Sequence, residues 1–226
     1  MTQTSEGNTA ERKAAERKEA GSRRCLIITS HIDQADQITV DPEEYDAVIA
    51  ADGGLIQAEE LGIRPDILIG DYDSCELPEG RDAVVLPAEK DMTDSEAALD
   101  LAYERGFRRA VILGGLGGRF DHTMGNIGLL AKYCGKMEEL AFVDGINRVT
   151  MKAPGSYIIP RDDYYYLGLA AYGGPCAGLS AQGVKYPLDD YTLPDDPTLG
   201  VSNELLGREA EITFRGGKLL IIQSRR

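Results

Sequence analysis

Acidic side chains follow two apolar segments of the chain in close succession. The segment 47–51 stops at Asp52-Gly53-Gly54, and the segment 67–69 runs into Gly70-Asp71-Tyr72-Asp73-Ser74. Asp71 and Asp73 are two residues apart, so in an extended chain their carboxylates point the same way. Carboxylate oxygens placed in this way suit Mg²⁺, which takes its remaining ligands from water and phosphate. A plain polar turn is the alternative, because Asp and Ser are common turn residues.

A glycine-rich segment, Gly114-Gly115-Leu116-Gly117-Gly118, precedes Arg119, Asp121 and His122. Glycines let the backbone approach a ligand closely, and the first N–H groups of a following helix offer an anion site. Arg119 adds planar donors that suit phosphate. The pattern matches neither the Walker A motif nor G-x-G-x-x-G. A merely flexible loop is the weaker alternative, because Arg-x-Asp-His stands directly at the helix entry.

A third polar stretch runs from Lys90 through Asp91, Thr93 and Asp94. Thr93 and the Glu three residues later match a capping box, which predicts a helix that runs to about Arg105. An acid in the first turn complements the helix dipole, and this alone accounts for Asp94. The dipole does not account for Lys90 and Asp91, which come just before the helix.

Apolar segments alternate with helical patterns through the first two thirds of the chain, and this alternation predicts an open, mostly parallel sheet. In such a sheet, ligands bind beyond the carboxyl ends of the strands. His31 follows the first strand, and a lone polar residue there is more often structural than catalytic. The expected strands are 25–29, 47–51, 67–69, 83–86, 110–113 and 140–143, and the expected helices start near residues 54, 93 and 120.

The pattern changes after Asn147, where helical periodicity fades. Short β-like segments separated by Gly and Pro turns predict a compact all-β domain. The first 23 residues have mixed charge and no apolar face, which predicts a disordered or loosely attached tail. We therefore expect a tail over residues 1–23, an α/β domain over 24–146 and a β domain over 147–226.

The composition narrows the class of protein. Among 226 residues, 24 are Lys or Arg and 38 are Asp or Glu, which gives a net charge of −14. This charge argues against nucleic acid as a partner and favours a cationic substrate. The four cysteines form no CxxC pair, so neither a zinc knuckle nor a redox motif is indicated. With no signal peptide and no apolar run that could span a membrane, we expect a cytoplasmic protein with reduced thiols.

Several short motifs, taken together and in order, resemble the thiamine pyrophosphokinase family. The resemblance covers the chain from about Cys25 to its end and rests on Ala51-Asp52-Gly53-Gly54, Gly62-Ile63-Arg64-Pro65-Asp66, Gly70-Asp71-Tyr72-Asp73-Ser74, Lys90-Asp91-Met92-Thr93-Asp94, Gly118-Arg119-Phe120-Asp121-His122 with Asn126, Gly183-Val184-Lys185-Tyr186-Pro187-Leu188 and Gly200-Val201-Ser202-Asn203-Glu204.

The resemblance implies a Rossmann-like catalytic domain, a smaller C-terminal β-sandwich domain, and a homodimer with thiamine near the subunit interface. It implies that Asp52, Asp71, Asp73 and Asp94 surround Mg²⁺ and the triphosphate of ATP. It also implies that Arg119 contacts phosphate and that Asp121 and Ser202 hold thiamine. Further ligand-binding residues implied by the same motifs are Gly53, Gly54, Lys90, Thr93, His122, Asn126 and Asn203. The chain has no tryptophan, so any aromatic stacking on thiamine needs another residue.

The implied reaction is transfer of pyrophosphate from ATP to the hydroxyl of thiamine, which gives thiamine pyrophosphate and AMP. Such a transfer depends mainly on positioning and on charge stabilisation, which carboxylates with a metal, glycine-loop amides and an arginine can supply. Asp94 or Asp121 is placed to accept the hydroxyl proton. Two alternatives stay open: an ATP-dependent kinase for another small alcohol, and a binding protein that has lost catalysis. The cluster of acids disfavours the second.

Overall fold

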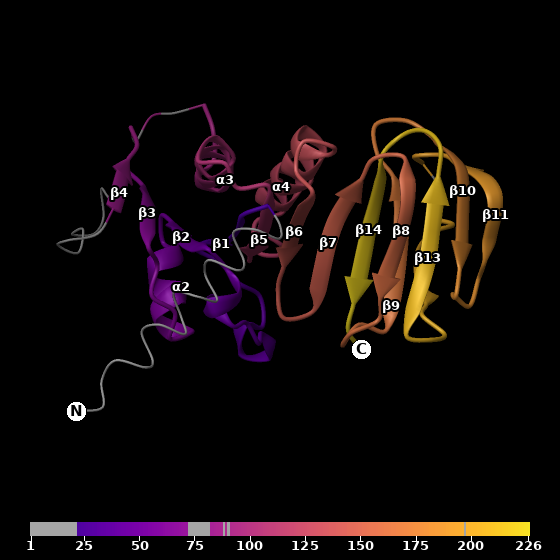
Figure 1. Ribbon diagram of the computed structural model, residues 1–226, viewed down its shortest axis with the longest axis horizontal. Coiled ribbons are helices and arrows are strands. Elements are labelled where there is room, and N and C mark those ends of the chain that lie inside the picture. The colour runs from indigo at the N-terminus through magenta and orange to yellow at the C-terminus, as the bar shows by residue number, and fades with distance from the viewer. Residues whose placement is uncertain (1–21, 72–81, 88, 90, 197) are drawn as a thin grey trace.

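Two β-sheets and three α-helices make up the described part of the chain (Figure 1). The computed structural model describes residues 22–71, 82–87, 89, 91–196 and 198–226. The helices are α2 (Gly54–Glu60), α3 (Asp94–Glu104) and α4 (Phe120–Tyr133), with short 3-10 helices η1 (Ala35–Gln37) and η2 (Pro42–Glu44). The strands are β1 (Arg24–Ile28), β2 (Ala47–Ala51), β3 (Ile67–Gly70), β4 (Asp82–Val85), β5 (Arg109–Leu113), β6 (Glu139–Val143), β7 (Asn147–Lys152), β8 (Gly155–Pro160), β9 (Tyr166–Ala171), β10 (Cys176–Gln182), β11 (Leu188–Leu193), β12 (Asn203–Glu204), β13 (Glu209–Phe214) and β14 (Leu219–Ser224).

Six parallel strands form one half of the larger sheet, in the order β6-β5-β1-β2-β3-β4. These are the strands that the apolar segments predict, each within a residue or two of its expected ends. Helices cover both faces of this half, and every residue of β2 is accordingly buried. β1 lies between β5 and β2. The chain therefore adds β2, β3 and β4 on one side of β1 and then adds β5 and β6 on its other side. This reversal between β1 and β5 is where ligands bind in open α/β sheets.

The other half of the larger sheet is antiparallel and belongs to the C-terminal third of the chain. β7 pairs with β6, and β14, β9 and β12 follow outward. The expected boundary at residue 147 therefore falls at the start of a strand that continues the same sheet. The coarse prediction, an α/β part followed by an antiparallel β part, is confirmed, whereas the boundary itself stays a prediction.

The smaller sheet, in the order β11-β10-β13-β8, covers one face of the antiparallel half. The alternation of side chains along β14 shows which face the smaller sheet covers. Leu220 joins the core that lies beneath α3 and α4, whereas Leu219 and Ile221 pack in the core between the two sheets. Because successive side chains of a strand point to opposite faces, the smaller sheet lies on the face away from α3 and α4. The side chains beneath α2, such as Leu26 and Val111, form a third core on that same face.

The helix boundaries follow the sequence signals. The Thr93 hydroxyl accepts a hydrogen bond from the backbone N–H of Glu96 at 3.2 Å, which confirms the predicted cap of α3. α2 ends before Gly62, whose φ of +68° is the left-handed conformation expected of a glycine just past a helix.

No helix in the described part of the chain is long and apolar enough to cross a membrane. Three cysteines, Cys25, Cys134 and Cys176, lie in that part and carry free thiols.

Candidate active site

Three helix N-termini meet at one edge of the parallel strands. α2, α3 and α4 each follow a strand of the parallel half, so each helix begins at the edge where those strands end. The first N–H groups of a helix are free to bind an anion, and the helix dipole favours negative charge there. We call this edge the catalytic edge. Its geometry suits a phosphate-bearing ligand.

The glycine loop 114–118 packs against the segment that follows β1. The Gly115 N–H donates to the carbonyl oxygen of His31 at 3.1 Å, and the Thr29 hydroxyl donates to the carbonyl oxygen of Leu113 at 2.9 Å. Gly114 has a φ of +87°, and a Cβ there would lie 2.1 Å from the His31 oxygen. Only glycine fits this position, so the loop is fixed at the reversal between β1 and β5.

His31 belongs to this site, although the sequence favours a structural role for it. A Cβ on Gly118 would lie 3.1 Å from His31 Nε2, so the imidazole lies directly over the end of the glycine loop. The side chain of Asp33 lies equally close to Gly117. The position of His31 directly after a central strand is the one sequence signal that indicates a role here. Its place opposite the glycine loop depends on the strand order.

Asp52 and Asp71 stand at the ends of two adjacent strands, β2 and β3. The Asp52 N–H donates to the carbonyl oxygen of Ile69 at 2.7 Å, and a Cβ on Gly70 would lie 3.0 Å from the Asp52 Cα. Asp52 takes a left-handed φ of +49°, and both aspartates are half-buried. Gly54 begins α2 so close to β1 that a Cβ would lie 2.0 Å from the Ile28 oxygen. The ligand-binding role of Gly53 and Gly54 stays a prediction.

The chemistry of these donors fits Mg²⁺, which needs only one or two protein carboxylates when water and phosphate complete its ligands. Two further predicted residues, Asp73 and Lys90, lie outside the described residues. Within the described ranges, no three side chains of His, Cys, Asp or Glu lie close enough together to hold a metal by themselves. Among the described residues, Asp52 and Asp71 are the carboxylates at the strand ends that would hold a metal together with the ligand's own oxygens.

Arg119 and Asp121 form an exposed ion pair at the start of α4. Two contacts join them: Nη2 to Oδ2 at 2.6 Å and Nε to Oδ1 at 3.2 Å. The Asp121 carboxylate also accepts from the His122 backbone N–H at 3.0 Å. The hydrogen bond from Arg119 lowers the pKa of Asp121 below its ordinary value. An exposed ion pair contributes little to stability. The Arg119 guanidinium can therefore leave Asp121 and donate to an incoming phosphate instead.

Asp94 and Asn126 approach the same edge from the helix layer. α3 packs on β2 and β3, and Asp94 is its first residue, half-buried beside Thr93. Asn126 is buried, and its side-chain N–H donates to the carbonyl oxygen of Gly115 at 2.7 Å. Asn126 therefore fixes the glycine loop in place, which is a positioning role different from the direct ligand contact that the motif implies.

Ser202 and Asn203 lie far from the catalytic edge of their own chain. They stand at the start of β12, five strands away from β5. At about 4.8 Å between neighbouring strands, this separation is roughly 24 Å. Asn203 is buried and clamps the backbone of Tyr186, to which it donates at 2.8 Å and from which it accepts at 3.0 Å. Ser202 is exposed, with a φ of +62°.

Comparison with known proteins identifies both halves of the chain. Residues 42–142 match the family model of the thiamin pyrophosphokinase catalytic domain, and residues 156–219 match that of its vitamin B1 binding domain. A thiamine pyrophosphokinase of Bacillus subtilis is 34% identical over 190 residues, which cover 80% of this chain and 89% of that protein.

Two crystal structures extend the likeness to the fold. A thiamin pyrophosphokinase family protein from Enterococcus faecalis superposes with a TM-score of 0.80 at 30% identity and covers 91% of this chain and 100% of that one. A thiamin pyrophosphokinase from Geobacillus thermodenitrificans gives a TM-score of 0.77 at 32% identity and covers 90% of this chain and 98% of that one. The chain therefore belongs to the thiamine pyrophosphokinase family, whose enzymes transfer pyrophosphate to thiamine.

Proposed function

We propose that this chain transfers the pyrophosphoryl group of ATP to the hydroxyl of thiamine at the catalytic edge, with AMP as the second product. The observation that carries the proposal is the meeting of acids, a glycine loop and three helix N-termini where β1 and β5 part. The family models support the same substrates. A cytoplasmic location fits a substrate such as ATP and stays part of the proposal.

The parallel half acts as a Rossmann-like sheet that holds ATP. The N–H groups of the glycine loop and of the first turn of α4 bind phosphate oxygens, and Arg119 turns from Asp121 to the same group. His31, over the end of the loop, contacts the triphosphate or the ribose. Asp52 and Asp71 would hold Mg²⁺, which supplies charge neutralisation to the triphosphate when it is bound.

Two acids remain for the thiamine side of the reaction. Asp121, which loses its ion pair when Arg119 turns to phosphate, is then an exposed carboxylate that can pair with the positively charged thiazolium ring. Asp94, half-buried at the start of α3, is the better placed group to accept the proton of the hydroxyl. The oxygen then attacks the β-phosphorus, and the bond to the α-phosphate oxygen breaks to release AMP.

A second copy of the chain completes the thiamine site. Ser202 lies too far from the glycine loop to share a ligand with it in one chain, so the contact requires Ser202 of the partner subunit. Exposed apolar side chains stand at both places. Phe120 is 74% exposed and Met124 48% on α4, and Tyr186 is 61% and Val201 63% exposed beside Ser202. These side chains fit a homodimer in which the two surfaces meet.

A direct assay tests the reaction. The purified protein, given ATP, Mg²⁺ and thiamine, should form equal amounts of AMP and thiamine pyrophosphate. Formation of ADP would indicate a simple kinase instead. Absence of product, together with saturable thiamine binding, would indicate a binding protein.

Complementation between subunits tests the shared site. Asp94→Asn and Ser202→Trp should each inactivate the homodimer from a different side of the site. In a dimer with one copy of each variant, one of the two sites has both intact residues. After random mixing, half of the dimers contain one copy of each variant, and one of the two sites in each of these dimers is intact. The mixture should therefore regain about a quarter of the wild-type activity. No recovery in a mixture shown by mass spectrometry to contain mixed dimers would mean that each chain builds its own site.

A further inference from the structure

A cavity lies on the face of the larger sheet that α2 and the smaller sheet share. α2 covers this face around β1, and the smaller sheet covers it around β9 and β14. The middle strands β5, β6 and β7 lie between these two covers, and a cavity of about 330 Å³ opens there. Ligand sites have volumes of roughly 300 Å³ and more, so the cavity can hold a small metabolite. We call it the junction cavity.

The floor of the junction cavity is apolar and its two walls carry aromatic rings. Val111, Leu113 and Val143 project from β5 and β6 to form the floor. Tyr45, just after η2, stands on one wall, and Tyr164, just before β9, stands on the other. Burial raises the pKa of both phenols, so both remain neutral hydroxyl donors. The surface thus offers an apolar body a place to lie and a polar group two hydroxyl donors.

Two arginines enter the cavity with hydrogen-bonding capacity to spare. Arg225 donates from Nη1 to the carbonyl oxygen of Gln37 at 2.6 Å, but its Nη2 is 3.9 Å from Asp163. Its Nε is buried and has no acceptor among the described residues. Arg148 shares the Glu139 carboxylate with two other arginines. Both side chains are partly exposed, 25% for Arg148 and 26% for Arg225, and a carboxylate is the acceptor that best matches a guanidinium.

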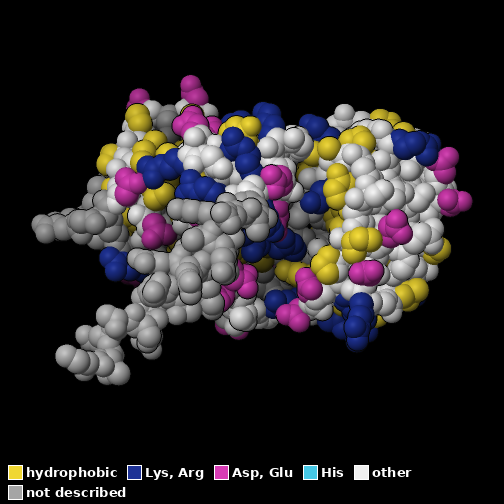
Figure 2. Space-filling view, in the orientation of Figure 1, with side chains coloured by type: hydrophobic (Ala, Val, Ile, Leu, Met, Phe, Trp, Pro, Cys, Tyr) yellow, Lys and Arg dark blue, Asp and Glu magenta, His cyan; other side chains and the backbone are white. Residues whose placement is uncertain are grey.

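The acids around the cavity limit the charge that it accepts. Asp144 is buried, and its carboxylate already accepts from the backbone of Ile146 and Asn147. The other acids, Glu44, Asp162 and Asp163, are exposed at the rim. Rim acids repel a multiply charged anion such as phosphate more strongly than a single carboxylate. The inner arginines attract the carboxylate once it has passed the rim. In Figure 2, Lys and Arg side chains gather in the hollow between the two halves of the molecule.

We propose that the junction cavity binds a small, singly charged carboxylate with an aromatic or apolar body. The carboxylate lies between Arg148 and Arg225, and the body lies on Val111, Leu113 and Val143 between the two tyrosine rings. This inference does not depend on the proposed reaction, because none of these residues is assigned to ATP, thiamine or Mg²⁺, although Leu113 and Val143 end β5 and β6 beside the glycine loop.

Calorimetry on the full-length protein tests the proposal with matched ligands. 3-Phenylpropanoate should bind saturably, whereas its neutral amide and inorganic phosphate should bind at least ten times more weakly. Arg225→Gln should weaken the binding of 3-phenylpropanoate at least tenfold. Arg215→Gln, which removes an exposed arginine paired with Asp190 at the far side of the smaller sheet, should leave it unchanged. Equal affinity for the acid and the amide, or for phosphate, would overturn the proposal.

A second variant keeps the test valid if loss of Arg225 disturbs the fold. Val143→Phe keeps every charge and fills the floor of the cavity, so it should abolish binding without lowering the melting temperature. Asp71→Asn, at the catalytic edge, should bind 3-phenylpropanoate as the wild type does. Undiminished binding by a folded Val143→Phe, or its loss in Asp71→Asn, would place the ligand elsewhere and overturn the proposal.

Discussion

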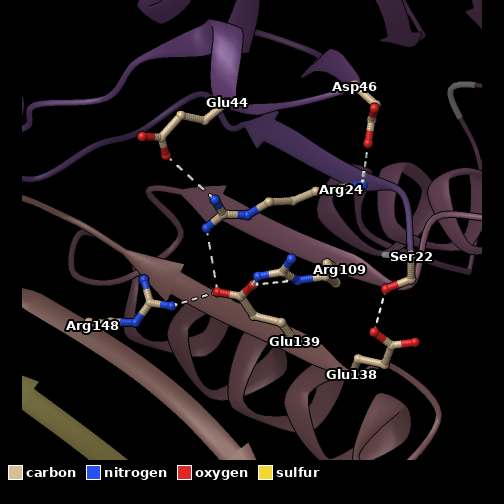
Figure 3. A network of polar contacts seen from close by, with 8 residues as sticks. All are labelled: Ser22, Arg24, Glu44, Asp46, Arg109, Glu138, Glu139 and Arg148. Atoms are coloured by element: carbon tan, nitrogen blue, oxygen red, sulfur yellow. Dashed lines mark hydrogen bonds and ion pairs between the residues drawn. The ribbon is translucent and has the colours of Figure 1, made fainter. Parts of the chain in front are cut away.

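The two ends of the same parallel strands use their charges in opposite ways. At the amino ends, the Glu139 carboxylate accepts from Arg24 at 3.5 Å, from Arg109 at 3.0 Å and from Arg148 at 2.9 Å (Figure 3). Arg24 also lies 3.6 Å from Glu44. At the carboxyl ends, the aspartates and the glycine loop face outward at the catalytic edge. At one end a single carboxylate is thus shared by three arginines, whereas at the other the aspartates stand beside a glycine loop, with an exposed Arg119–Asp121 pair at the start of α4.

This difference also extends to the backbone. At the amino ends the strands keep regular pairing, and the side chains reach across them to one another. At the carboxyl ends, Asp52 and four glycines of the loop 114–118 take positive φ values. Such conformations are unfavourable for a residue with a side chain, and they occur mainly where function requires them. The ion pairs at the amino ends stabilise the sheet, and the unusual backbone at the carboxyl ends supports the proposal that the chemistry takes place there.

The largest effect on stability is expected from Glu139→Ala. Its side chain is only 19% exposed, and its removal leaves three guanidinium groups close together without their shared carboxylate. We expect a loss of about 2–4 kcal/mol in the free energy of unfolding, by analogy with other interrupted buried ion pairs. Urea denaturation measures this, and the KM values of the folded variant should stay near those of the wild type. Glu138→Ala is the matched control, because the Glu138 side chain is exposed and accepts a hydrogen bond from the Ser22 hydroxyl.

The same network makes the free energy of unfolding depend on pH. Burial alone would raise the pKa of Glu139, but Arg24, Arg148 and Arg109 together lower it. A carboxyl group whose pKa is lowered by folding contributes stability above its unfolded pKa, about 4.3, and loses that contribution as the pH falls. The difference in stability between the wild type and Glu139→Gln should therefore shrink below about pH 4.3. A difference that stays constant as the pH falls would show that Glu139 is not ionised in the folded protein.

A substitution at the catalytic edge should lower activity and leave stability unchanged, the reverse of what we expect for Glu139→Ala. Asp71→Asn keeps the size of the side chain but removes a charged oxygen, so turnover should fall at least 100-fold, which is about 2.7 kcal/mol. The free energy of unfolding should hardly change, because Asp71 is only half-buried at the end of its strand. Steady-state kinetics and urea denaturation on one preparation separate the two effects. Near-normal turnover would contradict the role of Asp71 in holding the metal and phosphate.

The two ends also differ in how far the sequence predicts them. The acids and glycines of the catalytic edge form short local motifs, so Asp52, Asp71, Arg119 and Asp121 can be identified directly. The members of the Glu139 network come from residues 24, 109, 139 and 148, and only the strand order brings them together. The place of His31 opposite the glycine loop likewise depends on the strand order. A sequence without an alignment contains no signal for such contacts.

Among the elements, the sequence predicts the six parallel strands from their apolar segments, whereas it does not mark β10, β11 and β12. β10 contains Gly178 at a φ of +68°, and its pairing with β11 changes register, so neither shows regular alternation. β11 contains two consecutive aspartates, a residue type that is rare in strands. β12 has two residues and exists only because it pairs with β9. These strands are stabilised by tertiary pairing rather than by local preference.

A smaller effect at the catalytic edge is expected from His31→Ala. Its imidazole lies over the end of the glycine loop, where its ring nitrogens can donate to the ligand. Loss of one hydrogen bond to a charged group corresponds to about 1.5–3 kcal/mol, so the KM for ATP should rise at least tenfold. The KM for thiamine should stay nearly constant. Arg215→Gln is the control, because Arg215 is exposed on the smaller sheet, where it pairs with Asp190. An unchanged KM for ATP in His31→Ala would return His31 to a structural role.

The smallest effect is expected at the most distant residue of the proposed site, Ser202. Its hydroxyl is exposed at the start of β12, where it supports no buried contact of its own chain, so its removal should not change stability. In the proposed dimer, this hydroxyl would lie against thiamine bound to the other subunit and form one hydrogen bond with it. One such bond corresponds to about 0.5–1.5 kcal/mol. Ser202→Ala should therefore raise the KM for thiamine several-fold and leave the KM for ATP unchanged. The neighbouring Asn203→Ala provides the contrast, because Asn203 clamps the Tyr186 backbone and its loss should lower the melting temperature. A rise in the KM for ATP, or no change in either constant, would show that Ser202 belongs only to a surface turn. It would also show that β12 of one subunit does not meet the catalytic edge of the other.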